Sequence, residues 1–297
     1  MSQNFLERLQ NNRNNQSYVR DCPVGSYDAD PGWRRTEMIA FDRAPAHMLA
    51  PRNASPEMIT GINFHSFFLT RESFDNETVW EPMEFMGKSK TTLAKNGGCR
   101  EDYRAFKDEN IGRTILSQAT KKQFSGMRDS ILNHKPTREI YDRAAPEVSC
   151  FFDLDGKDLP GKARIDLEKI VEEPILIDIK TTHSAEPGRN IQNIISNFKL
   201  FRQSAFYLDG YNSSLNTKAS KFVLIFIEKE YPYMMNSVQM PDEWTEIGRK
   251  DNNVSKDNFK KWLDSGAQDT FYSPAIDTVE VPYWAKPDPE INLLTNR

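Results

Sequence analysis

This 297-residue chain has few cysteines, no long apolar run and no large excess of one charge sign. Its three cysteines, Cys22, Cys99 and Cys150, are odd in number and far apart, so they form neither a disulfide framework nor a CxxC zinc pair. No apolar stretch approaches the roughly 18 residues that a membrane helix needs, and the first residues lack the apolar core of a signal peptide. We therefore expect a protein of the reducing cytoplasm with no membrane segment.

The net charge is also small, because 39 Lys and Arg residues face 43 Asp and Glu residues, which gives a formal charge of −4. Any polyanion site must then be local rather than a basic coat over the whole protein. Residues 88–138 are the exception, since they hold 12 basic residues against 5 acidic ones. This excess could line a groove for a phosphate backbone, or it could belong to ordinary solvated helix faces.

The first half of the chain is predicted to be helical after a polar start. Residues 1–35 are rich in Asn, Gln, Arg and Asp and show little apolar periodicity, which indicates a flexible N-terminal arm. Ser55 and Pro56 are typical of an N-cap and a first helical position. One expected helix places Met58, Ile62, His65 and Leu69 on its inner face, and another, starting at Ser117, turns Phe124, Met127 and Ile131 inward.

The second half shows the alternation that is typical of strands. Three strands, a helix and a fourth strand are expected in turn, at 147–154, 162–168, 174–182, 191–211 and 222–228. A last helix is expected over 241–263, with an interruption near 251–253 and Gly266 as its C-cap. This order predicts an α+β fold in a single domain over residues 36–285, followed by a C-terminal tail at 286–297.

The third predicted strand carries the residues with the clearest chemistry. Alternate residues of a strand share a face, so Asp178 and Lys180 point one way while Ile177 and Ile179 point into the core. A neighbouring strand could bring Asp166 beside them, and two close carboxylates repel each other unless a cation lies between them. Hard oxygen ligands suit Mg²⁺ or Mn²⁺, and a nearby lysine can orient an attacking water. By itself, however, D-x-K is also typical of an amphipathic strand with a surface ion pair.

Further motifs make the sequence resemble a nuclease superfamily. Asp166, eleven intervening residues and then Asp178-x-Lys180 resemble the PD-(D/E)xK signature. Gln203 and Tyr207, on the predicted helix, are similar to the QxxxY element of the RecB-like branch. Their i, i+4 spacing puts both side chains on one helical face, where they could contact the same DNA strand or the active site.

The resemblance narrows to the nuclease domain of exonuclease VIII, the RecE type, and covers about residues 36–284. Glu147 resembles the extra acidic ligand of the phage-exonuclease members. Further matching segments follow in the family's order: Arg43–His47, Gly61–Leu69, Ala163–Asp166, Asp178–Thr182, Phe206–Gly210 and Glu228–Tyr233. The resemblance implies a restriction-endonuclease-like, PD-(D/E)xK core, in which helices flank a central mixed β-sheet.

The resemblance also implies a metal site. Asp166, Asp178, Glu147 and the carbonyl oxygen of Ile179 would bind Mg²⁺, for which Mn²⁺ could substitute. His65 would approach the same metal, although a lone histidine on an apolar helix face is more often a structural residue. These residues would bind the scissile phosphate through the metal.

The remaining catalytic roles fall to three residues. Lys180 would position the water that attacks the phosphate, and Gln203 and Tyr207 would support the site or the bound strand. By resemblance the protein would degrade one strand of linear double-stranded DNA from its ends, in the 5′ to 3′ direction, and leave 3′ single-stranded overhangs. A single-strand annealing protein would use these overhangs in phage-type recombination, and three or four subunits would form a closed ring around the DNA.

Two alternatives remain open at this point. One is an endonuclease or an end-trimming nuclease of the same fold, and the other is a non-catalytic DNA-binding protein. End trimmers of the kind that carry a four-cysteine iron–sulfur cluster are disfavoured by three scattered cysteines. The intact set of Asp166, Asp178 and Lys180 argues against a non-catalytic protein. A bacterial host, with the gene on a phage or prophage, is the expected setting.

Overall fold

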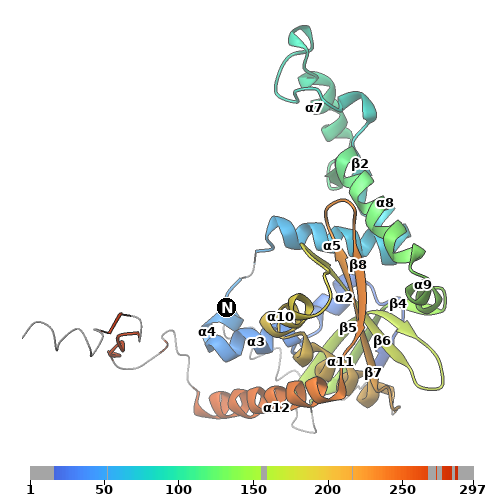
Figure 1. Cartoon of the computed structure of the whole chain (residues 1–297). Helices are drawn as coiled ribbons and strands as arrows, with labels where there is room; N and C mark the ends of the chain where they lie inside the picture. The colour runs from blue at the N-terminus through green and yellow to red at the C-terminus, as the bar shows by residue number, and fades with distance from the viewer. Residues whose placement is uncertain are drawn as a thin grey trace, which may run out of the picture.

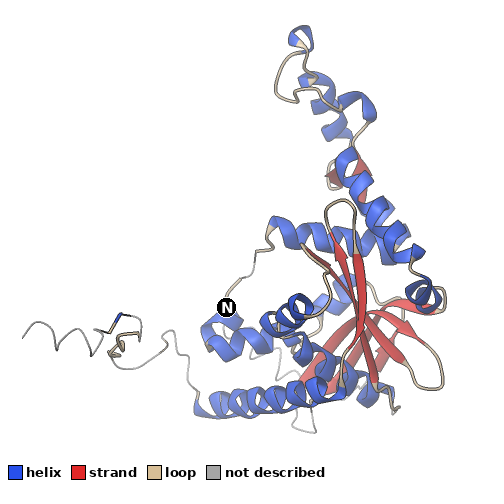
Figure 2. Ribbon diagram, in the orientation of Figure 1, coloured by secondary structure: helices blue, strands red, loops and turns tan. Residues whose placement is uncertain are grey.

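A six-stranded mixed β-sheet with helices on both faces forms the centre of the computed structural model (Figures 1 and 2). The structure describes residues 17–51, 53–154, 159–215, 217–266, 272, 276–282 and 285–286. In this part of the chain the strand order is β1-β4-β5-β6-β7-β8, and β2 pairs with β3 in a separate small sheet. The central mixed sheet flanked by helices that the sequence predicts is therefore confirmed.

The strands of the main sheet follow the alternation of the sequence closely. β4 (Ala144–Asp153), β5 (Pro160–Lys169) and β6 (Ile175–Thr182) form an antiparallel meander. β7 (Lys221–Glu228) runs parallel to β6, and β8 (Met235–Gln239) pairs antiparallel with β7. The three strands of the meander and β7 match the four strands expected from the sequence.

A helical crossover joins the parallel strands β6 and β7, as a parallel pair requires. It consists of two helices, α10 (Arg189–Asn197) and α11 (Leu200–Leu215), rather than the single helix predicted over 191–211. Lys199, between them, has a left-handed backbone with φ of 49°. Phe and Lys are tolerated inside helices, so the local sequence gives no sign of this break.

The last helix, α12 (Asp242–Ser265), is continuous, so the interruption expected near 251–253 is wrong. Asn252 is buried there and accepts a hydrogen bond from Nε of Arg202 at 2.9 Å. Asn252, one of the polar residues that suggested a break in the helix, thus makes a tertiary hydrogen bond from within it. Gly266 ends the helix in the left-handed region, as the sequence predicts.

The alternation along the strands sorts the core into two halves. On β7, Phe222, Leu224 and Phe226 belong to the cluster that contains residues of α11 and α12. The intervening Val223, Ile225 and Ile227 belong to the cluster that contains residues of α5 and α8. The sheet is therefore covered on both faces, which explains why β7 is apolar between its terminal Lys221 and Glu228.

The helix α5 (Pro56–Leu69) begins where the sequence predicts but buries a different face. Ser55 accepts a hydrogen bond from the backbone N–H of Met58, which confirms the N-cap. Met58 and Ile62 are exposed, however, while Phe64, Phe67 and Phe68 are buried. The predicted inner face is therefore wrong at Met58 and Ile62 and confirmed at Leu69, which is buried. The helix is apolar on two sides, and the aromatic side covers more area. For α8 (Gln118–Asn133) the prediction is confirmed, since Phe124, Met127 and Ile131 are fully buried.

The described part of the expected N-terminal arm is built into the fold. β1 (Ser17–Val19) pairs antiparallel with β4, and α2 (Val24–Ala29) follows it. Trp33 is fully buried and stacks on Phe259, with 4.3 Å between the ring centroids. The prediction of a flexible arm is therefore wrong for residues 17–35. Although these residues are mostly polar, backbone pairing with the edge of the sheet and the burial of Trp33 hold them in place. Residues 1–16 lie outside the described part of the chain.

A segment that the sequence does not predict projects away from the sheet. It comprises residues 81–113, named here the projecting lobe, and Figure 1 shows it beyond the end of α8. It leaves the body after β2 (Thr78–Trp80) and returns through β3 (Thr114–Leu116), which pairs with β2 in parallel. Its own elements are η1 (Met83–Phe85), η2 (Ala94–Asn96) and α7 (Arg100–Glu109).

Short helices complete the structure. They are α3 (Arg35–Arg43), α4 (Pro45–Leu49), α6 (Arg71–Glu77) and α9 (Lys135–Tyr141). None of the helices in the described ranges combines the length and the apolar character that crossing a membrane requires. The C-terminal tail expected from residue 286 lies almost wholly outside the described residues.

Candidate metal centre and active site

The candidate site lies where β5 and β6 separate. Their pairing ends at Leu167 and Ile177, one residue before Asp166 on one strand and Asp178 on the other. Beyond this point the backbone N–H of Ile179 donates to Oδ2 of Asp166, at 2.7 Å, instead of to a backbone carbonyl. The divergence of the strands makes room for two carboxylates that regular pairing would force together.

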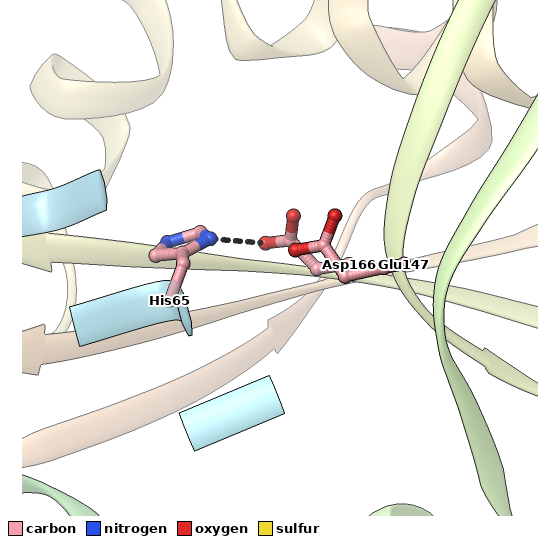
Figure 3. A group of neighbouring side chains, drawn as sticks. All are labelled: His65, Glu147 and Asp166. Atoms are coloured by element: carbon pink, nitrogen blue, oxygen red, sulfur yellow. Dashed lines mark ion pairs between the residues drawn. The ribbon is translucent and has the colours of Figure 1, made fainter. Parts of the chain in front are cut away.

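Three possible metal ligands from different elements meet at this point. One ligand atom each from His65 on α5, Glu147 on β4 and Asp166 on β5 lies within 4.8 Å of the other two. Figure 3 shows the imidazole pointing toward the two carboxylates, and Nδ1 of His65 is 3.4 Å from Oδ2 of Asp166. Two carboxylates and an imidazole form a donor set that suits a divalent cation such as Mg²⁺ or Mn²⁺.

Glu147 reaches this group through an unusual backbone. In the register of β4 and β5 it stands opposite Asp166, between the regular pairs Pro146–Leu167 and Val148–Ile165. This is the position at which the ladder is interrupted, and φ of Glu147 is 52°. A left-handed conformation at a residue other than glycine costs of order 1–3 kcal/mol, so the surrounding fold must stabilise it. The strain places a second carboxylate beside Asp166.

Asp178 is held by a different set of partners. Its Oδ2 is 2.6 Å from Nζ of Lys180, and its Oδ1 accepts a hydrogen bond of 2.6 Å from Nε2 of Gln203. Asp178 and Gln203 are buried, whereas the Lys180 side chain is 30% exposed. The lysine therefore extends from the buried carboxylate toward solvent, where a substrate could meet it.

Burial and charge shift the pKa values of the group in opposite directions. Burial lowers the pKa of His65, but the charge and hydrogen bond of Asp166 outweigh it and raise that pKa to about 9. Burial raises the pKa of Asp166, yet His65 and Lys180 lower it to a net value below its usual range. Burial, together with the charge of Asp166, raises the pKa values of Asp178 and Glu147 despite their basic neighbours. A cation bound among these carboxylates would relieve their repulsion.

The structure brings nearly all of the predicted site residues to one place. His65, Glu147 and Asp166 form the mutually close group, and Asp178, Lys180 and Gln203 adjoin it through β6. Tyr207 packs its ring against Phe222, and burial followed by the charge of Asp178 raises its pKa. Ile179 contributes its N–H to Asp166, while metal binding by its carbonyl stays a prediction.

Two arginines complete the surroundings of the site. Arg164 donates from Nε to Oε2 of Glu147, so the structure assigns it an ion pair with a neighbouring acid. Arg35 donates to Oε1 of Gln203 at 3.2 Å, which leaves the Nε2 of that amide to donate to Asp178. Sequence reasoning missed Arg35 because 168 residues separate it from Gln203 and it fell in the expected arm.

The fold and the site define a class of protein, and sequence comparison agrees. A profile of the family described as "PDDEXK-like domain of unknown function (DUF3799)" matches residues 36–271. The chain therefore belongs to this family, and so to the PD-(D/E)xK nuclease superfamily, whose members use divalent metals. The expected restriction-endonuclease-like core is confirmed. No curated protein sequence matches the chain.

One solved structure supports the fold. A protein from Eubacterium rectale named "Putative exonuclease" superposes with a TM-score of 0.59, at 11% sequence identity, over 94% of this chain and 100% of its own. Two further structures overlap only weakly. SSO0001 has a TM-score of 0.28, at 14% identity, over 70% of this chain and 87% of its own. VC1899 from Vibrio cholerae has a TM-score of 0.22, at 11% identity, over 70% and 52%.

Proposed function

We propose that the protein is a Mg²⁺-dependent exodeoxyribonuclease that acts on the ends of linear double-stranded DNA. The observation that carries this proposal is the convergence of Asp166, Asp178 and Lys180 where β5 and β6 separate, with His65 and Glu147 beside them. Buried carboxylates beside a partly exposed lysine suit phosphodiester hydrolysis, which needs a cation site and an oriented water.

The chain's own residues divide the work. His65, Glu147 and Asp166 would hold the divalent cation, together with Asp178, and this cation would neutralise the charge that develops on the phosphate. Lys180 orients the attacking water and donates to the scissile phosphate from its position 2.6 Å from Asp178. Gln203 fixes the Asp178 carboxylate by donating to its other oxygen.

Tyr207 is one helical turn beyond Gln203 on α11 and faces the same side. A tyrosine hydroxyl is protonated at neutral pH, and burial raises the pKa of Tyr207 further, so it can donate a hydrogen bond to a phosphate or a base. We assign it a role in holding the DNA strand near the site.

The resemblance to RecE-type enzymes supports the finer parts of the proposal. The enzyme would work in the 5′ to 3′ direction and leave 3′ overhangs for a single-strand annealing protein. Three or four subunits would form a ring, which lets weak contacts retain DNA through many cycles of cleavage. A bacterial cytoplasm and a phage or prophage gene are the setting that this pathway requires.

An assay with closed circular and linear duplex tests the proposal directly. With Mg²⁺, the protein is expected to release nucleotides from linear duplex labelled at either end and to leave the closed circle intact. Loss of 5′ label before 3′ label would support the polarity. Cleavage of the closed circle would instead favour an endonuclease, and absence of any Mg²⁺-dependent product would favour a non-catalytic protein.

A further inference from the structure

The projecting lobe is a folded structure of its own rather than a loose loop. Phe85 packs against Tyr103 and Phe106, with ring centroids 5.6 and 5.7 Å apart. An ion pair of 2.5 Å joins Lys90 to Glu81, and Cys99 N donates to the carbonyl of Ser89 at 2.9 Å. These contacts hold the lobe's surface in a defined arrangement away from the active site.

Positive charge is concentrated on one part of this surface. Residues 85–100 include four basic residues and no acidic residue, in a protein whose net charge is −4. On α7, Arg100, Arg104 and Lys107 recur at i, i+4 and i+7, so they form a stripe along one side of the helix. Of the acidic residues of α7, Asp108 borders this stripe, one turn after Arg104, while Glu101, Asp102 and Glu109 lie away from it.

Several of these basic side chains are exposed and form no ion pair with the residues that the structure describes, so they could bind an anionic ligand. Lys90 is paired with Glu81, and Arg100 with Glu101. Lys88, Lys95 and Arg104 are exposed and have no ion pair with any residue that the structure describes. The lobe as a whole has seven basic and six acidic residues, so its positive excess is local to residues 85–100 and the neighbouring basic side of α7. A polyanion that lies along this part of the lobe would neutralise it.

A duplex is the polyanion that fits this surface best. Hydroxyl groups lie between the lysines, since Ser89 is hydrogen-bonded to Thr92 at 2.8 Å and Thr91 is next to it. Lysines and arginines with intervening hydroxyls contact phosphate oxygens without reading bases. A regularly spaced phosphate backbone extends far enough to reach a lobe that stands away from the site.

We propose that the projecting lobe is a second contact site for duplex DNA, which binds backbone phosphates through Lys88, Lys95 and Arg104. The inference rests on the proposed function, in which duplex DNA is the substrate. It adds a site outside the catalytic centre that retains the duplex while its end is processed. Binding there is electrostatic, independent of sequence, and weakened by salt.

The test measures the affinity of the full-length protein for a blunt, fluorescent 40-bp duplex without divalent metal, so that no cleavage occurs. The lobe variant is Lys88→Gln/Lys95→Gln/Arg104→Gln. The matched control is Lys250→Gln/Lys260→Gln/Lys261→Gln, which removes three exposed positive charges from α12. Both sets of residues are exposed, and thermal melting verifies that each variant is folded.

The lobe variant is expected to bind at least about 10-fold more weakly at 0.1 M salt, while the control binds like the wild type. The dependence of log K on log salt should become shallower by about 2 to 3, since each lost phosphate contact contributes about 0.9. Equal affinity and slope in the lobe variant and the control would overturn the proposal.

A protein partner is the competing occupant, because Met83 and Met86 are also exposed on the lobe. Met83→Ser/Met86→Ser should therefore leave duplex binding unchanged, and weaker binding in this variant than in the lobe variant would contradict the inference. The binding assay does not depend on cleavage. If the wild type proves inactive on DNA while the lobe variant still binds more weakly, the proposed function fails and the lobe assignment stands.

Discussion

The body of the protein and its projecting lobe use charge in opposite ways. In the body, Glu147, Asp166 and Asp178 are brought together in a largely buried group, where their repulsion must be balanced by His65 and Lys180. On the lobe, the cations are exposed and far less constrained. Burial makes electrostatic interactions strong and specific, whereas exposure makes them weak and screened by salt. Changes in the body should therefore cost far more than changes on the lobe.

The largest effect is expected from removing the lysine of the body's site. Lys180→Ala should lower the rate of Mg²⁺-dependent cleavage about 10³-fold, because it removes a group that acts on the water and phosphate in the transition state. Duplex binding without metal should change little. The rate of nucleotide release measures the effect, with Lys221→Ala, at the exposed start of β7, as the control. Cleavage by Lys180→Ala near the wild-type rate would remove this lysine from the mechanism.

Stability gives a second contrast between the two regions. Trp33→Ala should lower the free energy of unfolding by about 3–5 kcal/mol, because it opens a cavity beneath Phe259 in the main core. Phe85→Ala should mainly loosen the lobe and leave the global transition nearly unchanged. Urea unfolding reports the first effect, and hydrogen exchange of α7 reports the second. If Trp33→Ala lowered the free energy of global unfolding by less than about 1 kcal/mol, residues 17–35 would behave as the flexible arm that the sequence predicts.

Divalent metal should stabilise the body but not the lobe. A cation that binds only the folded state, at a free concentration 100 times its dissociation constant, raises the free energy of unfolding by about 2.7 kcal/mol. We therefore expect millimolar Mn²⁺ to raise the melting temperature, and Glu147→Gln to reduce that rise. The melting curve of each protein with and without Mn²⁺ provides the measurement. An unchanged midpoint in active protein would contradict a metal site built from these carboxylates.

The smallest effect in the body concerns a residue that acts through another. Arg35 donates to Oε1 of Gln203, and thereby fixes which end of the amide meets Asp178. Arg35→Gln should lower kcat about 10-fold, comparable to one hydrogen bond to a charged group. Gln203→Ala should lower it at least as much, and the double variant should add little because both act on Asp178. If the losses of kcat in the two single variants added fully in the double variant, Arg35 would not act through Gln203.

The strands and the site could be predicted because their signals are local. Alternation over β6 places Asp178 and Lys180 on one face whatever the rest of the chain does, and Ile177 and Ile179 are indeed fully buried. The spacing of Asp166 and Asp178 fits an antiparallel pair of strands. The superfamily was therefore recognisable from a few short segments.

The remaining features depend on contacts between distant segments. The strain at Glu147 and the hydrogen bond from Arg35 to Gln203 arise only when distant parts of the chain meet. The helix α5 has two apolar sides, and only tertiary packing determines which of them is buried. Phe64 is buried in the core, whereas Ile62 is exposed. The lobe was visible only as an excess of positive charge, because composition indicates a charge balance but not where the chain leaves the sheet.

The central claim is that the carboxylates where β5 and β6 separate form a metal-dependent nuclease centre. The most direct test compares nucleotide release from linear duplex by the wild type and by Asp178→Asn, which keeps the shape of the side chain and removes its charge. We predict steady release by the wild type only when Mg²⁺ is present, and no release above background by Asp178→Asn with or without the metal. Equal, Mg²⁺-dependent release by the two proteins would contradict the claim.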